Sequence, residues 1–321
     1  MNKNVFLSVA AALMLAACSN DDQLPPEETP IRLSAGLDVA AGTRGITDNS
    51  YTGTLFSGGE SVDVNIKETN NGTSASYGTG GWLTATIGDG GNGATLSPVC
   101  YWPGSGHGID IYAWYPVSTA TTYWTTAHNV FKVPATQDGN TVHKAFDLMY
   151  ATPASGTGDA HQTVDSSTRA SAINLQFHHK LAKLVVALMP QETNAGVTAE
   201  DLENATVTIG DVKTTADVVS ATGEVTASTT AQTETLSVMA NEAGTTGYAL
   251  IPAQTLSGTL TVTLKAGGRM TTTLSGFGGF AVLAGQTNTL NVKVSLTDIT
   301  VTTTIVQWTE NNNAGNAELK L

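Results

Sequence analysis

The sequence is poor in positive charge and in cysteine. Its 321 residues include only 14 Lys and Arg against 27 Asp and Glu, and the formal net charge is −13. A nucleic-acid partner requires a basic surface that neutralises phosphate, so this balance argues against DNA or RNA binding. Two cysteines are too few for a framework of internal disulfides. The apolar run at residues 5–17 is too short to span a bilayer.

The sequence also lacks the usual signatures of an enzyme or a metal site. It contains no nucleophile-elbow and no phosphate-loop pattern. None of its six histidines has metal-ligand spacing, and the adjacent His178 and His179 point to opposite faces of a strand. The glycine-rich loop at residues 88–93 offers only Asp89 as an anionic ligand, which favours a turn over a calcium site. We therefore predict a protein that is not an enzyme, with no catalytic residue, no metal and no cofactor.

What the chain does have is an N-terminal export signal. Lys3 precedes the apolar run, and the run ends Leu15-Ala16-Ala17-Cys18, which resembles the lipobox of bacterial lipoproteins. We predict that residues 1–17 are a signal peptide and that Cys18 carries the lipid that anchors the chain. The acidic run at residues 19–22 resembles that of surface-exported lipoproteins in Bacteroides-type bacteria. The expected location is the outer membrane, at the cell surface.

An alternating segment follows an acidic, proline-rich tether. Side chains of a strand point to opposite faces with period two, and residues 31–39 place five apolar residues on one face. These residues are Ile31, Leu33, Ala35, Leu37 and Val39. Arg44 and Gly45 come next, in a segment typical of an exposed link. One hypothesis is that residues 18–44 are a tether and removable first strand, cut between Arg44 and Gly45; the alternative is an ordinary first strand that stays in place.

The rest of the chain is rich in Thr, Val and Gly, which favours short strands and tight turns. Residues 152–168 lose all apolar periodicity and are predicted to be a linker or a long surface loop, with the domain boundary near its end. About seven strands are expected on each side of it. This pattern predicts an all-β protein of two tandem antiparallel β-sandwich domains, at residues 45–168 and 169–321.

Cys100 and the five tryptophans bear on function. Cys100 lies in the apolar run Val99-Cys100-Tyr101-Trp102, so we expect a buried core residue rather than a nucleophile. Exposed tryptophans would favour an alternative function, that of a surface lipoprotein that binds glycans. The candidates are Trp82, Trp102, Trp114, Trp124 and Trp308. Three of them lie in strand-like apolar runs, so core packing is expected for most.

Four stretches, taken in order, resemble a known family. They are residues 99–116, 146–151, 177–184 and 249–255, and they accompany the lipobox and Arg44. Together they resemble the fimbrillins of Bacteroides and Porphyromonas, the FimA-like and Mfa1-like type V pilins. The resemblance implies two transthyretin-like β-sandwich domains and a lipoprotein precursor that is cut after an Arg beyond the first strand. It also implies that the partners are other pilin subunits, one of which fills the vacated groove with a terminal strand, and that the fimbria supports adhesion.

A subunit of the fimbrial stalk needs a strand to donate as well as one to lose. The candidate is the carboxy-terminal segment, residues 299–321, which alternates in two places. Its apolar positions are Ile299, Val301, Ile305, Trp308, Leu319 and Leu321.

Simple energetics agree with strand replacement. Burying Ile31, Leu33, Leu37 and Val39 stabilises by roughly 6–12 kcal/mol in all, an upper estimate. The whole stability of a domain is about 5–15 kcal/mol. Loss of the strand would leave unpaired backbone on both sides of a groove, and a donated strand restores both the pairing and the burial.

Overall fold

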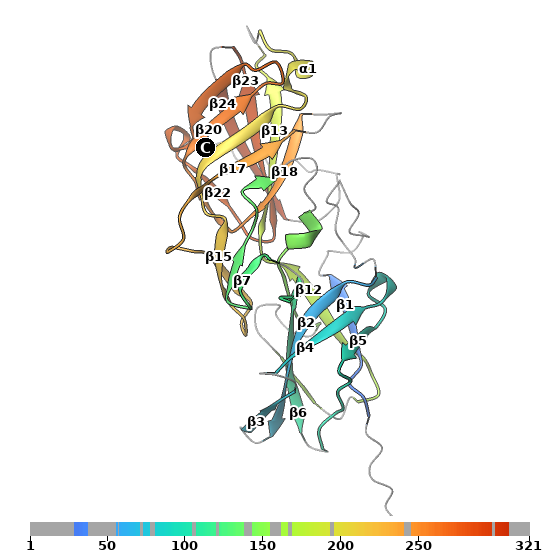
Figure 1. Cartoon of the computed structure of the whole chain (residues 1–321). Coiled ribbons are helices and arrows are strands. Elements are labelled where there is room, and N and C mark those ends of the chain that lie inside the picture. Colours follow the sequence, from blue (N-terminus) through green and yellow to red (C-terminus); the bar gives the residue numbers. More distant parts are fainter. Residues whose placement is uncertain are drawn as a thin grey trace, which may run out of the picture.

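The structure is a computed structural model that describes residues 29–37, 56, 58–70, 73–77, 81–104, 107–119, 122–137, 143–154, 162–165, 169–192, 196–240, 245–296 and 299–307. Strands dominate these residues (Figure 1), which confirms the all-β prediction. The helical elements among them are short, namely α1 (Ala199–Leu202) and the 3-10 turns η1 (Asp89–Gly91), η2 (His143–Phe146) and η4 (Leu274–Phe277). None of the helices in the described part is long and apolar enough to cross a membrane.

The first lobe is a single nine-stranded sheet. In spatial order its strands are β11 (Gln162–Asp165), β6 (Gly108–Tyr115), β10 (Met149–Pro153), β12 (Ile173–His179), β1 (Leu33–Leu37), β5 (Ala94–Ser97), β4 (Trp82–Ile87), β2 (Ser61–Asn70) and β3 (Thr73–Ser76). The β6 strand pairs with β10 and β11 along one edge and with β2 along the other. The sheet therefore closes on itself into a ring of seven strands, and β1 is one member of that ring.

The ring encloses the first buried core. Apolar side chains at alternate positions of its strands point inward, as in β4, where Leu83, Ala85 and Ile87 are buried. Phe56 adds a ring that meets Phe177 and Tyr115 edge-on, with centroid distances of 5.0 and 5.8 Å. Ile31, Leu33 and Ala35 belong to the same buried cluster. The first strand is thus part of this core.

The second lobe has two sheets around one core. The first is β18 (Thr246–Ile251), β13 (Ala182–Pro190), β23 (Gln286–Val294) and β24 (Ile299–Gln307). The second is β21 (Arg269–Thr273), β20 (Thr259–Thr263), β14 (Thr206–Val212), β17 (Glu234–Met239) and β9 (Thr136–Gln137). A small pair, β19 (Gln254–Leu256) and β22 (Phe280–Val282), lies beside them. β13 and β23 bury alternate residues against this core, which is the period expected of a strand with one covered face.

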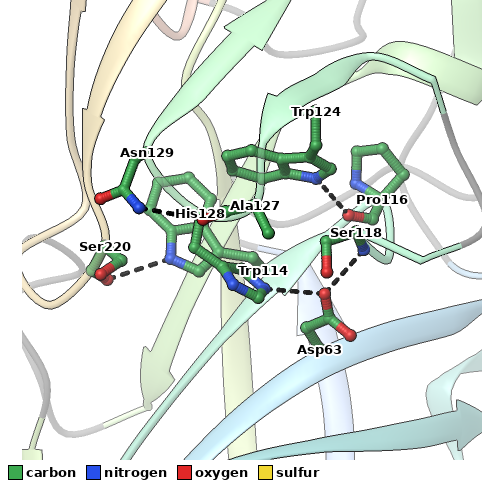
Figure 2. Close-up of polar contacts among 9 residues, drawn as sticks. All are labelled: Asp63, Trp114, Pro116, Ser118, Trp124, Ala127, His128, Asn129 and Ser220. Atoms are coloured by element: carbon green, nitrogen blue, oxygen red, sulfur yellow. Dashed lines mark hydrogen bonds and ion pairs between the residues drawn. The ribbon is translucent and has the colours of Figure 1, made fainter. Parts of the chain in front are cut away.

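A third core joins the lobes. Figure 1 shows β7 and β15 between them, in a sheet of β16 (Glu224–Ala227), β15 (Thr215–Val219), β8 (Val130–Lys132) and β7 (Trp124–Thr126). Its buried side chains come from both halves of the sequence: Tyr112, Trp114, Trp124, Phe131, Val133, Phe146, Leu148, Tyr150, Leu181, Val218 and Leu250. The Trp114 Nε1–H donates to the carbonyl of Ser220 at 3.0 Å, so the largest of these rings is also satisfied in hydrogen bonding (Figure 2).

The grouping of strands differs from the division predicted between residues 168 and 169. β12 follows that point, yet it pairs with β1 and β10 and stays in the first core. β8 and β9 precede it, yet they pair with β15 and β17. The chain enters the second core only at β13. Loss of periodicity marks a loop, whereas pairing between distant strands leaves no local signal.

Candidate functional site

The site of interest is the place occupied by β1. This strand runs parallel to β12, in a register that sets Leu33 opposite Ile173 and Leu37 opposite Phe177. Its other edge meets β5 through Leu33 and Ala94. A parallel partner on one edge and an antiparallel one on the other make β1 an interior strand of the ring.

The residues before β1 extend its pairing. The Ile31 N–H donates to the carbonyl of Cys100 at 2.8 Å, and the Trp102 N–H donates to the carbonyl of Thr29 at 2.9 Å. On the opposite edge, the Ile173 N–H donates to the carbonyl of Arg32 at 2.9 Å. Residues 29–37 are therefore bonded on both edges, and we call the space they fill the first-strand slot.

The two faces of the slot differ as the sequence predicts. Ile31, Leu33 and Ala35 are 5%, 2% and 6% exposed, whereas Arg32 is exposed. The Ser34 hydroxyl donates to the side-chain oxygen of Asn174 at 3.3 Å on the outer side. The inward alternation of Ile31, Leu33 and Ala35 is confirmed. Leu37 is the last residue of β1, and Val39 lies outside the described residues.

Cys100 forms part of the wall of the slot. Its backbone carbonyl accepts the Ile31 hydrogen bond, and its side chain is 5% exposed within the same buried cluster as Ile31. Burial raises the pKa of the Cys100 thiol, which keeps it protonated and unreactive. The prediction of a buried core cysteine is confirmed, and its position beside β1 is something the sequence did not indicate.

The predicted donor residues lie in two different situations. Ile299 and Val301 are 1% and 6% exposed, and both belong to the core of the second lobe. Ile305 is partly exposed, near the end of the same strand. Trp308, Leu319 and Leu321 lie outside the described residues, as do Cys18, Arg44 and Gly45.

Most of the tryptophans proposed for glycan binding are in the core. Trp102, Trp114 and Trp124 are buried, which confirms core packing for these three. Trp82 is half-buried and stacks flat on the His128 ring, with 3.6 Å between centroids. Trp308 lies outside the described residues. The three buried rings give a sugar no platform to stack on, and His128 covers one face of Trp82.

His128 belongs to a polar cluster that sequence reasoning missed. Its Nε2 lies 2.8 Å from Asp63 Oδ2, and the Ser118 N–H donates to the same oxygen at 2.6 Å (Figure 2). The backbone of His128 has a φ of +59°, and this left-handed turn between β7 and β8 turns the ring toward β2. These contacts link the turn between β7 and β8, beside the third core, to β2 of the first lobe. Ser118 takes part through its backbone N–H, and the hydrogen bonds tie His128 to β2, so we assign the cluster a structural role.

One open cavity of about 440 Å³ lies at the ends of β2 and β6. Tyr115, Tyr123 and Glu60 contribute to its lining. The Glu60 carboxylate already pairs with Lys144 at 3.0 Å and accepts from the Gly58 N–H at 2.7 Å. The Tyr115 hydroxyl donates to the Lys144 carbonyl at 2.9 Å. These groups hold the protein together rather than offering themselves to a ligand.

Comparisons with known proteins find solved structures with a similar fold. A putative cell adhesion protein from Bacteroides uniformis is 19% identical with a TM-score of 0.60, covering 87% of this chain and 98% of that one. A second, from Bacteroides ovatus, is 15% identical with a TM-score of 0.63, covering 89% and 99%. The tip fimbrial protein Mfa3 from Porphyromonas gingivalis, truncated at its C-terminus, is 10% identical with a TM-score of 0.51, covering 88% and 100%. At these identities the likeness is one of fold. No match is found among curated proteins.

The sequence also matches a family model. The model is described as fimbrillin-like, and it aligns with residues 43–308. The matched region begins after β1 and ends one residue beyond β24. Since the match spans far more than half of the chain, the resemblance seen in the sequence is confirmed and the chain belongs to the fimbrillin-like family.

Proposed function

We propose that this chain is a structural subunit of an adhesive surface fimbria, and that its first strand holds a place later taken by a strand of another subunit. Its family is one of fimbrial structural proteins rather than enzymes. The observation that carries the proposal is the position of β1, the first strand of the chain yet an interior strand of the ring. A strand near the N-terminus can leave the sheet after one cut in the link that follows it.

The free energy of the protein favours a first-strand slot filled by another strand over a slot left empty. Burial of Ile31 and Leu33 contributes about 1.5–3 kcal/mol each, or roughly 3–6 kcal/mol together. Departure of the strand also frees the backbone edges of β12 and of residues 94–102, which β1 and its lead-in cover. Unpaired edges of this kind bind extended peptides by adding a strand. An emptied subunit is therefore a receptor for a second chain.

The full route uses the sequence signals at the N-terminus. The precursor is anchored to the outer membrane through a lipid on Cys18 and is displayed at the cell surface. A protease cuts between Arg44 and Gly45 and releases residues 18–44. The two lobes correspond to tandem transthyretin-like domains, and the first of them receives the donated strand.

The pairing of β24 supports a donor segment that lies beyond this strand. β24 pairs with β23 along nine residues, from Ile299 opposite Val294 to Gln307 opposite Gln286. Donating β24 would remove Ile299 and Val301 from the second core, at a cost comparable to vacating the slot itself. We therefore assign donation to the segment after Gln307, where Ala317, Leu319 and Leu321 alternate. Thr-rich β24 completes its own lobe.

Cys100 supplies the experiment that tests the proposal. In a secreted form with Cys18→Ala it is the single thiol of the mature chain. Alkylation of Cys100 is expected to be slow in the precursor, fast in monomer cut after Arg44, and slow again in the polymer. Mass spectrometry after timed exposure to iodoacetamide measures each rate.

The outcome against the proposal is equally distinct. If Cys100 stays protected in verified cut monomer from which residues 18–44 have dissociated, the slot has closed without a donor. If the cut chain remains monomeric at high concentration, strand exchange does not occur.

A further inference from the structure

The turn η1 makes an unusually close approach to the first-strand slot. Gly91, its last residue, is buried and has a φ of +79°. A Cβ built on Gly91 would lie closer than 3.0 Å to the carbonyl oxygen of Ala35, a separation that real Cβ atoms do not show. It would also lie 3.2 Å from the carbonyl carbon of Ala35. The backbone of β1 thus occupies the space that any side chain at position 91 would need.

A second glycine in the same loop provides a contrast. Gly93 has a φ of +87°, so a side chain there meets the same backbone strain as at Gly91. A Cβ on Gly93, however, would meet nothing within 4 Å. The two positions share a positive φ, but Gly91 is buried against the slot whereas Gly93 is exposed.

Backbone groups line the edges of the slot and hold the main chain of its occupant. The hydrogen bonds of Ile31, Arg32 and Thr29 described above join main-chain groups, and so does the contact at Gly91. On the outer face, a Cβ on Gly36 would meet only the Asn174 side chain, at an ordinary 3.5 Å. The outward positions therefore impose little restriction on side-chain identity. What the slot requires is an extended backbone with alternate apolar residues.

We propose that Gly91 is a positioning residue of the slot, and that its missing side chain admits the backbone of whichever strand occupies the slot. For the chain's own first strand this rests on geometry alone; for a donated strand it also rests on the proposed function. Because the clash involves backbone, no change in the sequence of the occupant relieves it. A single methyl group at position 91 excludes the resident strand and a donated strand alike.

The test compares Gly91→Ala with Gly93→Ala in the full precursor carrying Cys18→Ala. Gly91→Ala is expected to raise the rate of Cys100 alkylation by about tenfold or more, since the strand that covers the thiol is displaced by local opening. Gly93→Ala is expected to leave that rate within about twofold of the parent, because its strain falls outside the slot. Equal rates in the two variants would overturn the proposal.

Leu33→Asp provides the reference for a displaced strand. It forces a charge into the core and expels the strand without touching η1. Gly91→Ala is expected to match Leu33→Asp in circular dichroism and in Cys100 labelling, and the double variant to add no further change. If Leu33→Asp folds while Gly91→Ala does not, Gly91 supports the lobe itself and the proposal is wrong.

Labelling of the uncut monomer requires no polymer. If Gly91→Ala frees Cys100 while cut native protein fails to polymerise, the slot geometry stands and the proposed function fails. If native protein polymerises and Gly91→Ala behaves like Gly93→Ala, the proposed function stands and the proposal for Gly91 fails.

Discussion

An Arg44→Ala precursor is expected to remain a stable monomer under conditions in which the native precursor is cut and polymerises. The substitution removes the basic side chain that a trypsin-like protease recognises. Residues 29–37 then stay covalently attached and continue to fill the slot, so no donated strand can enter. The expected loss of polymer is complete rather than partial, because the slot has one occupant at a time.

The bonds after Arg32, Arg169 and Arg269 that a trypsin-like protease could cut are held in place by the fold, so we expect them to be cut more slowly than the bond after Arg44. Arg32 lies in paired backbone, with its carbonyl bonded to Ile173. Arg169 donates from Nη2 to the carbonyl of Pro103 at 2.7 Å, which ties its position to the first lobe. Arg269 opens β21 and pairs with Thr263 in a hairpin. Backbone held in this way resists proteases, which bind extended and mobile substrates.

Limited trypsin digestion with mass spectrometry measures the first cut, and thermal unfolding measures its consequence. The native precursor is expected to lose residues 18–44 first. The cut, strand-free monomer should unfold roughly 6–24 °C below Arg44→Ala, since the loss of roughly 3–6 kcal/mol of apolar burial shifts the midpoint by about 2–4 °C per kcal/mol in a chain of this size. Polymer formation by Arg44→Ala protein that retains residues 29–37 would contradict the placeholder hypothesis.

Removing residues 308–321 is expected to abolish polymerisation while leaving the monomer folded. β24 ends at Gln307 and already contributes Ile299 and Val301 to the second core, so circular dichroism and thermal stability should be close to native. The truncated, cut protein retains its slot. When mixed with native cut subunits it should therefore shorten the polymers by capping one end, an effect visible by electron microscopy or gel filtration.

A matched pair of substitutions tests the same segment within the full chain. Leu319→Asp with Leu321→Asp places charge on the apolar face predicted to enter the slot, at a cost that a donated strand cannot offset. Lys320→Asp changes charge on the opposite face and should polymerise normally. If both variants polymerise alike, the donor lies elsewhere in the chain.

Local features of the fold could be predicted from the sequence because strands with one buried face alternate. Residues 299–307 form a strand within the segment where alternation predicts one. The inward face of residues 31–35 was also correct. The segments that were missed are short or inconspicuous. β9 has two residues, and no period can be read from two residues.

Long-range features could not be predicted. Nothing in residues 31–37 indicates a parallel partner far away in sequence at Ile173, and nothing in the loop at residues 88–93 indicates contact with Ala35. The burial of Asp63 beside His128 depends on a left-handed turn and on a neighbouring strand. These are products of tertiary packing, which overrides local pattern. The first-strand slot is formed by strands that lie far apart in the sequence and meet only in the closed ring.

The central claim is that the first strand is absent from the assembled fimbria. The direct measurement is the N-terminal residue of this protein recovered from purified cell-surface filaments, by Edman degradation or peptide mass spectrometry. We predict a chain that begins at Gly45 and yields no peptide from residues 18–44. Filament subunits that begin at lipidated Cys18 and retain Ile31–Leu37 would contradict it.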